Sequence, residues 1–188
     1  MLDLMTRFIA LLRGINVGGR TIKSAELAEM FRSLGYEGVK TVLASGNVVF
    51  EADVGASALR SQIEKALGDR FEYDARAHVI DTDALAATID AYPFEARDGW
   101  HRYVVFLIGA APGGVGTERP AELDEIVRNA LELELDPALE QISDGGSVLY
   151  WTVERGHTLD SVVGKRLGTA RGKALTTSRN LNTLAKLL

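Results

Sequence analysis

A polar, glycine-rich segment follows directly after an apolar run near the beginning of the chain. The run is Phe8–Leu12, and the segment reads Arg13-Gly14-Ile15-Asn16-Val17-Gly18-Gly19. The backbone N–H groups of such a loop, together with an arginine, can bind an anion such as a phosphate group. The spacing is neither that of a P-loop nor G-x-G-x-x-G, so a dinucleotide-binding fold is not indicated. Alternatively, Asn16 and the glycines only supply the positive φ that a turn requires.

Two further segments are rich in hydrogen-bonding side chains. Ser45-Gly46-Asn47 is typical of a tight turn, and Thr176-Thr177-Ser178 precedes Arg179 and Asn180. The three hydroxyl residues predict the cap of a last helix, which places Arg179 in its first turn, where a cation opposes the helix dipole unless an anion lies there. Each segment also has a structural interpretation. In this interpretation Asn47 is an ordinary turn residue, and Arg179 forms an ion pair with an acidic residue elsewhere in the chain.

The charge of the chain is distributed unevenly. The net charge is −5, but residues 155–188 carry seven basic residues and one acidic residue, a net charge of +6, which leaves −11 for residues 1–154. A basic terminal segment on an acidic body indicates either an anionic partner or an internal clamp onto that body. Lys173 belongs to this segment, and both interpretations stay open.

The order of apolar patterns predicts how these segments are positioned. Strands over 7–13, 39–43, 48–50 and 75–80 alternate with two helices, which Ser24 and Ser57 are expected to cap and Gly35 and Gly68 to end. This order is β-α-β-β-α-β, the ferredoxin-like plait. In that fold the end of the first strand lies beside the start of the third, so residues 13–19 and 45–47 are expected to meet at one edge of the sheet.

The second half of the chain nearly repeats this order. A helix from Asp81 to about Tyr92 is followed by a strand over 103–108, a helix opened by Pro120, a hairpin over 139–153 and a short helix over 160–167. This is β-α-β-β-α, a plait without its last strand. We therefore predict an α+β protein with a ferredoxin-like subdomain, 1–80, and a second plait-like subdomain, 81–188. The basic C-terminal helical segment is expected to pack back on the first subdomain.

The composition excludes several classes of site. The absence of cysteine excludes disulfides, thiolate metal sites and a cysteine nucleophile, and it favours a reducing compartment. No apolar run approaches the ~18 residues that span a bilayer, and residues 1–5 lack the apolar core of a signal peptide, so we expect a cytoplasmic protein. His78, His101 and His157 have no partners at ligand spacing. We predict no metal and no cofactor, and no catalytic residue can be named.

Three stretches resemble the bacterial family known as domain of unknown function 1697. They are Leu11-Leu12-Arg13-Gly14-Ile15-Asn16-Val17-Gly18-Gly19, Ser45-Gly46-Asn47-Val48-Val49-Phe50 and Thr177-Ser178-Arg179-Asn180-Leu181-Asn182-Thr183. Leu181 departs from the Trp that is usual in the family. The resemblance implies an α+β fold of two plait-like subdomains, and it implies no activity because none is assigned to the family.

Three functions stay open at this stage. The first is binding of a phosphate-bearing or other anionic ligand, such as a nucleotide or an RNA, with Phe8 and Phe50 as candidates for stacking on RNA bases. The second is an enzyme acting on a small anionic substrate. The third is a structural or interaction protein without a ligand. No membrane partner is expected. The candidate ligand-binding residues are Arg13, Gly14, Asn16, Gly18, Gly19, Ser45, Asn47, Lys173, Thr177, Arg179 and Asn180.

Overall fold

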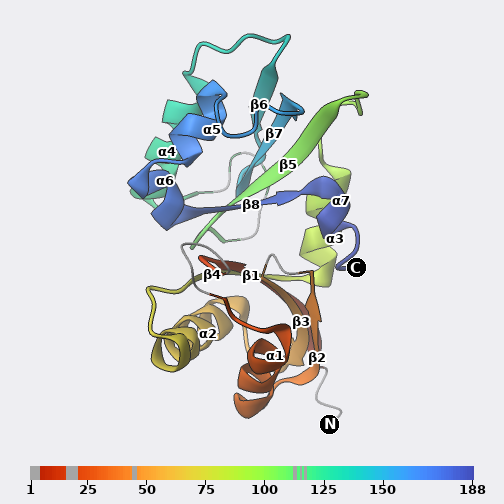
Figure 1. Ribbon diagram of the computed structural model, residues 1–188, viewed down its shortest axis with the longest axis vertical. Helices are drawn as coiled ribbons and strands as arrows, with labels where there is room; N and C mark the ends of the chain where they lie inside the picture. The colour runs from red at the N-terminus through yellow and green to blue at the C-terminus, as the bar shows by residue number, and fades with distance from the viewer. Residues whose placement is uncertain (1–4, 16–20, 44–45, 112–113, 115, 117) are drawn as a thin grey trace. The chain divides into compact units, whose positions relative to one another are not determined.

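The computed structural model describes residues 5–15, 21–43, 46–111, 114, 116 and 118–188. The chain divides into two compact units, described separately below. Unit 1 is Met1–Ala86 with Lys186–Leu188, and unit 2 is Ala87–Ala185. The elements (Figure 1) are β1 (Thr6–Arg13), α1 (Ser24–Ser33), β2 (Glu37–Val42), β3 (Asn47–Ala52), α2 (Ala56–Phe71), β4 (Arg76–Asp81), α3 (Thr82–Asp90), β5 (Trp100–Leu107), α4 (Ala121–Leu131), β6 (Glu140–Asp144), β7 (Val148–Glu154), α5 (Val162–Leu167), α6 (Ala170–Leu175), β8 (Thr176–Asn180) and α7 (Leu181–Leu184).

Unit 1 contains a four-stranded antiparallel sheet in the order β2-β3-β1-β4. The central strand β1 pairs with β3, where Phe8 lies opposite Phe50, and with β4, where Ala10 lies opposite Val79. The two helices connect β1 to β2 and β3 to β4. This is the ferredoxin-like arrangement, so the fold class predicted from the sequence is confirmed.

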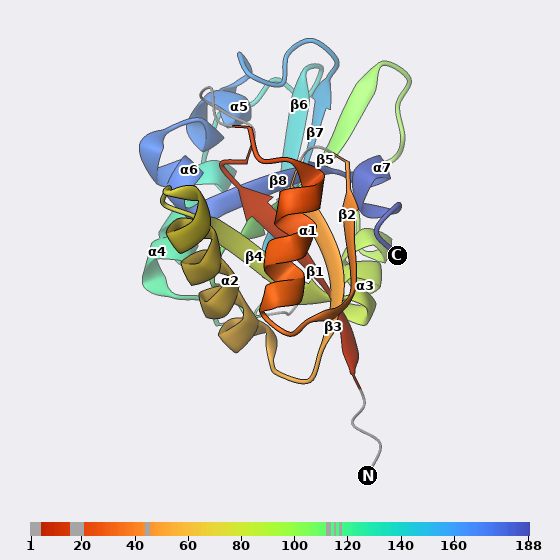
Figure 2. The same ribbon diagram turned by 60° about the horizontal axis from the view of Figure 1, so that its bottom comes forward.

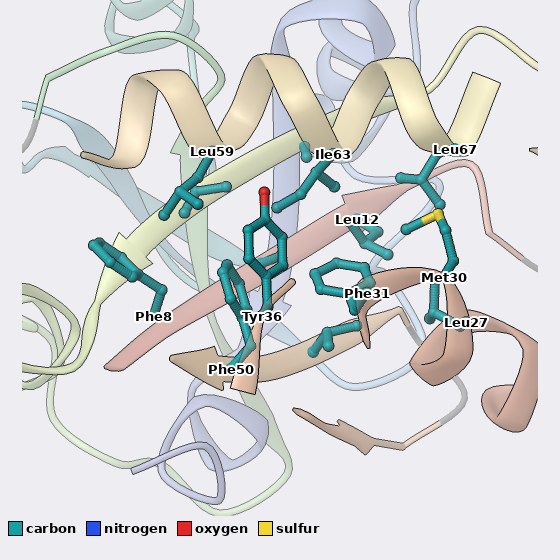
Figure 3. Packing of buried hydrophobic residues seen from close by; sticks show 14 of the residues in the cluster. Phe8, Leu12, Leu27, Met30, Phe31, Tyr36, Phe50, Leu59, Ile63 and Leu67 are labelled. Carbon is teal, nitrogen blue, oxygen red and sulfur yellow. The ribbon is translucent and has the colours of Figure 1, made fainter. Parts of the chain in front are cut away.

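Both helices of unit 1 cover the same face of its sheet (Figure 2). Alternate residues of a strand point to opposite faces, and Phe8 and Leu12 of β1 accordingly lie on the side of the sheet that faces α2 (Figure 3). The ring of Phe50 lies 5.3 Å from that of Phe31 and 4.8 Å from that of Tyr36, measured between centroids. On this side of the sheet the core is thus a layer of side chains beneath the helices, and apolar residues of the other face, such as Ile9 and Leu11, are buried as well.

The predicted N-caps of unit 1 and the predicted end of its second helix at Gly68 are wrong, whereas the first helix does end just before Gly35, which has a φ of +86°. α1 begins at Ser24 with Lys23 as its N-cap, and the Lys23 backbone N–H donates to Glu26 Oε2 at 3.4 Å. α2 has Gly55 as its N-cap in place of Ser57, and it continues through Gly68 to Phe71. Three leucine or isoleucine side chains on one stripe, Leu59, Ile63 and Leu67, are fully buried. Their burial stabilises the helix past a residue that local propensity marks as a stop.

Unit 2 repeats the architecture of unit 1 in full. Its sheet has the order β6-β7-β5-β8, in which β5 takes the central place of β1. The prediction of a plait without its last strand is therefore wrong, because Thr176–Asn180 forms β8 and pairs antiparallel with β5. This segment is not a helix cap. Asn180 caps α7 instead, since its Oδ1 accepts the backbone N–H of Asn182 at 2.9 Å.

A buried carboxylate anchors the second half of unit 2. Glu140, at the start of β6, is 2% exposed. Its carboxylate accepts hydrogen bonds from Trp151 Nε1 at 3.1 Å and from the Val162 backbone N–H at 2.7 Å. It also accepts the Val163 backbone N–H at 3.3 Å. An anion at the start of a helix is stabilised by the unpaired N–H groups of the first turn, so Glu140 fixes the beginning of α5 against β6 and β7.

Two tyrosine hydroxyls join α3 and the residues that follow it to the sheet of unit 2. Tyr92 donates to the carbonyl of Trp151 at 2.8 Å, and Tyr150 donates to the carbonyl of Thr88 at 2.9 Å. The two rings meet edge to face with centroids 5.3 Å apart. Burial is the main cause that raises the pKa of each phenol above its usual value.

We expect Glu140→Ala to lower the free energy of unfolding by about 3 kcal/mol, because it leaves buried N–H donors without an acceptor. Urea denaturation followed by circular dichroism measures this loss. Glu134→Ala is the control, since Glu134 is exposed, and it should change stability by less than about 0.5 kcal/mol. Equal effects of the two substitutions would contradict the anchoring role of Glu140.

The raised pKa of Tyr92 predicts a loss of stability in alkali. Below pH ~10 both the folded and the unfolded state keep the phenol proton, whereas above pH ~10 the unfolded state releases it first, so stability falls as pH rises. Tyr92→Phe removes this contribution. Its free energy of unfolding, measured in urea at a series of pH values from about 8 to 11, should fall less steeply than that of the wild type. Glu134→Ala keeps both hydrogen-bonded tyrosines and should retain the wild-type slope, since Glu134 is exposed.

Candidate functional site

The end of β1 and the start of β3 meet at one corner of the sheet of unit 1. The Leu12 backbone N–H donates to the carbonyl of Gly46 at 2.8 Å, and Leu11 lies opposite Asn47 in the antiparallel pair. The sequence predicted this meeting from the plait topology. For the residues described on both sides, the structure confirms it.

Two glycines shape this corner through backbone conformations that other residues rarely adopt. Gly14 and Gly46 both have φ of +75°. A Cβ atom on Gly46 would lie 3.2 Å from the Cβ of Leu12 and 3.3 Å from that of Ile15. Gly46 therefore allows the turn before β3 to approach β1 closely.

Asn47 is fully buried in the structure, and its Nδ2 donates to the carbonyl of Val42 at 3.0 Å. Val42 is also its partner residue across the β2–β3 pair. The side-chain amide of Asn47 thus adds a hydrogen bond between the two strands of the hairpin. This contact supports the structural interpretation of Asn47 as a turn residue.

Two residues that the sequence did not indicate lie at the same corner. Arg76 of β4 is the pairing partner of Arg13, and His78 is the partner of Leu11. Arg13, Asn47, Arg76 and His78 point to the sheet face opposite the helices, because they alternate with Leu12, Val48 and Ala77 of the helix-facing core. We call these four residues the arginine corner. The polar–apolar alternation of β4 was a visible signal, but only the register of β4 against β1 places Arg76 opposite Arg13.

The arginine corner concentrates positive charge. Arg13 and Arg76 occupy directly opposite positions in the sheet, where two like charges are unfavourable unless other groups compensate them. The guanidinium of Arg76 forms an ion pair at 3.2 Å with Asp74, whose side chain is 82% exposed, and such a surface pair contributes little. Burial lowers the pKa of Arg13, although an arginine stays charged at neutral pH.

The remaining described candidates belong to unit 2. Arg179 of β8 is 8% exposed, and its Nη1 donates to Thr177 Oγ1 and to the Ser178 carbonyl, both at 2.9 Å. The prediction that Arg179 lies in the first turn of a helix is wrong, because it is a strand residue opposite Val104. Thr177 is buried, Asn180 caps α7, and Lys173 is an exposed residue of α6.

The structure thus brings part of the predicted set together. Arg13, Gly14 and Asn47 lie at the corner of unit 1, whereas Lys173, Thr177, Arg179 and Asn180 lie in unit 2, so a site shared by both groups stays a prediction. Asn16, Gly18, Gly19 and Ser45 lie outside the described residues. Phe8 and Phe50 are wrong as candidates for stacking on RNA, because both rings belong to the core beneath the helices (Figure 3).

The comparisons with known proteins agree with this fold. Residues 5–133 match the model of a family described as "Protein of unknown function (DUF1697)". The chain belongs to this family. The matched range contains two of the three stretches on which the resemblance was based, and the description of DUF1697 assigns no activity.

A similar solved structure is described as that of the conserved bacterial protein SP0830 from Streptococcus pneumoniae. The two chains are 24% identical, with a TM-score of 0.78, and the alignment covers 97% of each. At this identity the likeness establishes the fold alone. No curated protein matches this DUF1697 chain.

Two features are absent from the described part of the chain. Within those residues, no group of three or more His, Cys, Asp or Glu side chains is arranged to hold a metal ion. Within the same residues, no helix is both long and apolar enough to cross a membrane.

We expect Gly46→Ala to lower the free energy of unfolding by about 1–2 kcal/mol, since alanine is strained at positive φ and its Cβ would press on Leu12. Thermal or urea unfolding measures the loss. Gly55→Ala is the matched control, because Gly55 has a φ of −71° and an added Cβ meets no atom within 4 Å. If both variants were equally stable, the close approach of the hairpin turn to β1 would not constrain the corner.

Proposed function

We propose that the arginine corner of unit 1 binds a phosphate-bearing ligand, such as a nucleotide or an RNA. The observation that supports this function best is the direct pairing of Arg13 with Arg76 across neighbouring strands. Paired residues in an antiparallel sheet have Cα atoms about 5 Å apart, so both guanidinium groups can reach one anion. An anion bound between them offsets their mutual repulsion.

Arginine suits this ligand for a geometric reason. The planar guanidinium presents parallel N–H donors that match two oxygens of a phosphate, and such charge-assisted bonds are stronger than those between neutral groups. His78 lies one row further along the same face. Its imidazole is buried, so the phosphate is expected to be held by the two arginines.

The bases of a nucleotide or RNA are expected to contribute less to binding than its phosphate groups. Plait domains that read RNA usually stack bases on aromatic residues of the sheet, and here Phe8 and Phe50 belong to the helix-facing core. The ligand is therefore expected to bind mainly through its phosphate groups, with an affinity that falls as the salt concentration rises. In the wider form of the proposal, Lys173, Thr177, Arg179 and Asn180 contribute to the same ligand.

The decisive measurement is a calorimetric titration of the full chain with ATP and with a short 5′-phosphorylated RNA, at low and at moderate salt. Arg76→Gln removes one cation from the arginine corner and should weaken binding about tenfold, because a hydrogen bond to a charged group contributes about 1.5–3 kcal/mol. Arg13→Gln should weaken binding to a similar degree or more. Arg179→Gln tests whether the candidate residues of unit 2 contribute to the same ligand.

Arg32→Gln is the matched control. Arg32 is an exposed arginine in the last turn of α1, so its loss changes the net charge of the protein by the same amount as the loss of Arg76. A decrease in affinity that is equal for Arg32→Gln and Arg76→Gln would indicate nonspecific attraction and contradict a site at the corner. Absence of any saturable binding to either ligand at low salt would also contradict it.

A further inference from the structure

Unit 2 contains a cavity between α4 and the corner where α5 meets α6. Its volume is about 210 Å³. A cavity of about 150 Å³ is enough for benzene, so this one has room for a ring of that size with one small substituent. It is lined by Glu125, Ile126, Asn129, Ala130, Arg166, Leu167, Thr169, Arg171 and Gly172.

The apolar part of the lining comes from both sides of the cavity. Ile126 and Ala130 lie on the buried stripe of α4, and Leu167 packs against the same core from the end of α5. A compact hydrocarbon group placed here would leave water and gain contact with three aliphatic side chains.

The charged part of the lining has an excess of one positive charge. Arg171 is held by Glu125 through two hydrogen bonds, at 3.2 Å and 2.7 Å. Arg166, the other cation, forms no ion pair with any residue that the structure describes. A ligand with a single negative charge would therefore neutralise the net positive charge of the lining.

The corner that carries these residues has a tightly constrained backbone. Thr169 caps α6, because its Oγ1 accepts the Gly172 backbone N–H at 3.1 Å, and the same hydroxyl donates to the Arg166 carbonyl at 2.8 Å. A Cβ on Gly172 would lie 2.6 Å from the Leu167 carbonyl oxygen, which is closer than a side chain tolerates. The backbone of this corner is thus held in place before a ligand arrives.

We infer that this cavity is a binding site for a small organic monocarboxylate with a compact apolar body, such as an aromatic acid. The body lies against Ile126, Ala130 and Leu167, and the carboxylate accepts hydrogen bonds from Arg166. This inference is independent of the anion site proposed for unit 1, because it uses other residues and another class of ligand.

The test is a titration of the isotope-labelled full chain with benzoate, followed by NMR chemical shifts, alongside the neutral analogue benzyl alcohol. Benzoate should bind saturably and shift the signals of residues around the cavity, and benzyl alcohol should bind at least about tenfold more weakly. Arg166→Gln should weaken benzoate binding about tenfold and leave the affinity for benzyl alcohol unchanged.

Two more variants complete the experiment. Lys165→Gln removes the same charge from the exposed neighbouring residue, which does not line the cavity, and should bind benzoate as the wild type does. Asn129→Phe places a ring at the half-exposed edge of the lining and should abolish binding with an unchanged unfolding temperature. The inference is overturned if benzoate does not saturate the wild type, if Arg166→Gln and Lys165→Gln bind it equally, or if benzyl alcohol binds as tightly.

Discussion

The carboxylate of Glu140 is the constraint on which the second half of unit 2 depends. A buried charge is tolerated only when hydrogen bonds replace the water it has lost, and here an indole N–H and two backbone N–H groups do so. Those donors belong to β7 and to the first turn of α5, so the carboxylate fixes where α5 begins. The positions of α6 and β8 follow, because both come directly after α5 in the chain. The basic residues of this segment are therefore carried on a backbone anchored by an acidic residue of β6.

The two units share a strand order, but they carry different residues at the equivalent corner of the sheet. In unit 1 the ends of β1 and β4 carry Arg13 and Arg76 opposite each other. At the equivalent place in unit 2, Leu107 of β5 pairs with Thr176 of β8, so that corner carries no charge. The charged residues of the unit 2 cavity lie on helices instead: Glu125 on α4, Arg166 on α5 and Arg171 on α6. The repeat is thus one of topology, and the two candidate sites do not correspond.

The sequence predicted the parts of the fold that apolar periodicity determines. The strand over 7–13, the hairpins and the βαββαβ order of unit 1 were correct because β1, β3 and β4 each carry a run of buried apolar residues, and turn residues mark the hairpins. The last strand was missed because Thr176–Asn180 is polar throughout, and only pairing with β5 makes it a strand. Its three hydroxyl residues matched a helix cap equally well. The caps at Ser24 and Ser57 were wrong by one or two residues, since several neighbouring residues can satisfy the first turn of a helix.

The bulge in β2 has a consequence for the behaviour of the protein at high concentration. β2 is an outer strand of its sheet, and its pairing with β3 shifts register between Glu37 and Lys40, where Gly38 has a φ of +58°. An irregular edge that carries a lysine cannot offer a straight row of N–H and C=O groups to a strand from another molecule. The irregularity that weakens pairing within the sheet thus also protects this edge against the growth of intermolecular sheets.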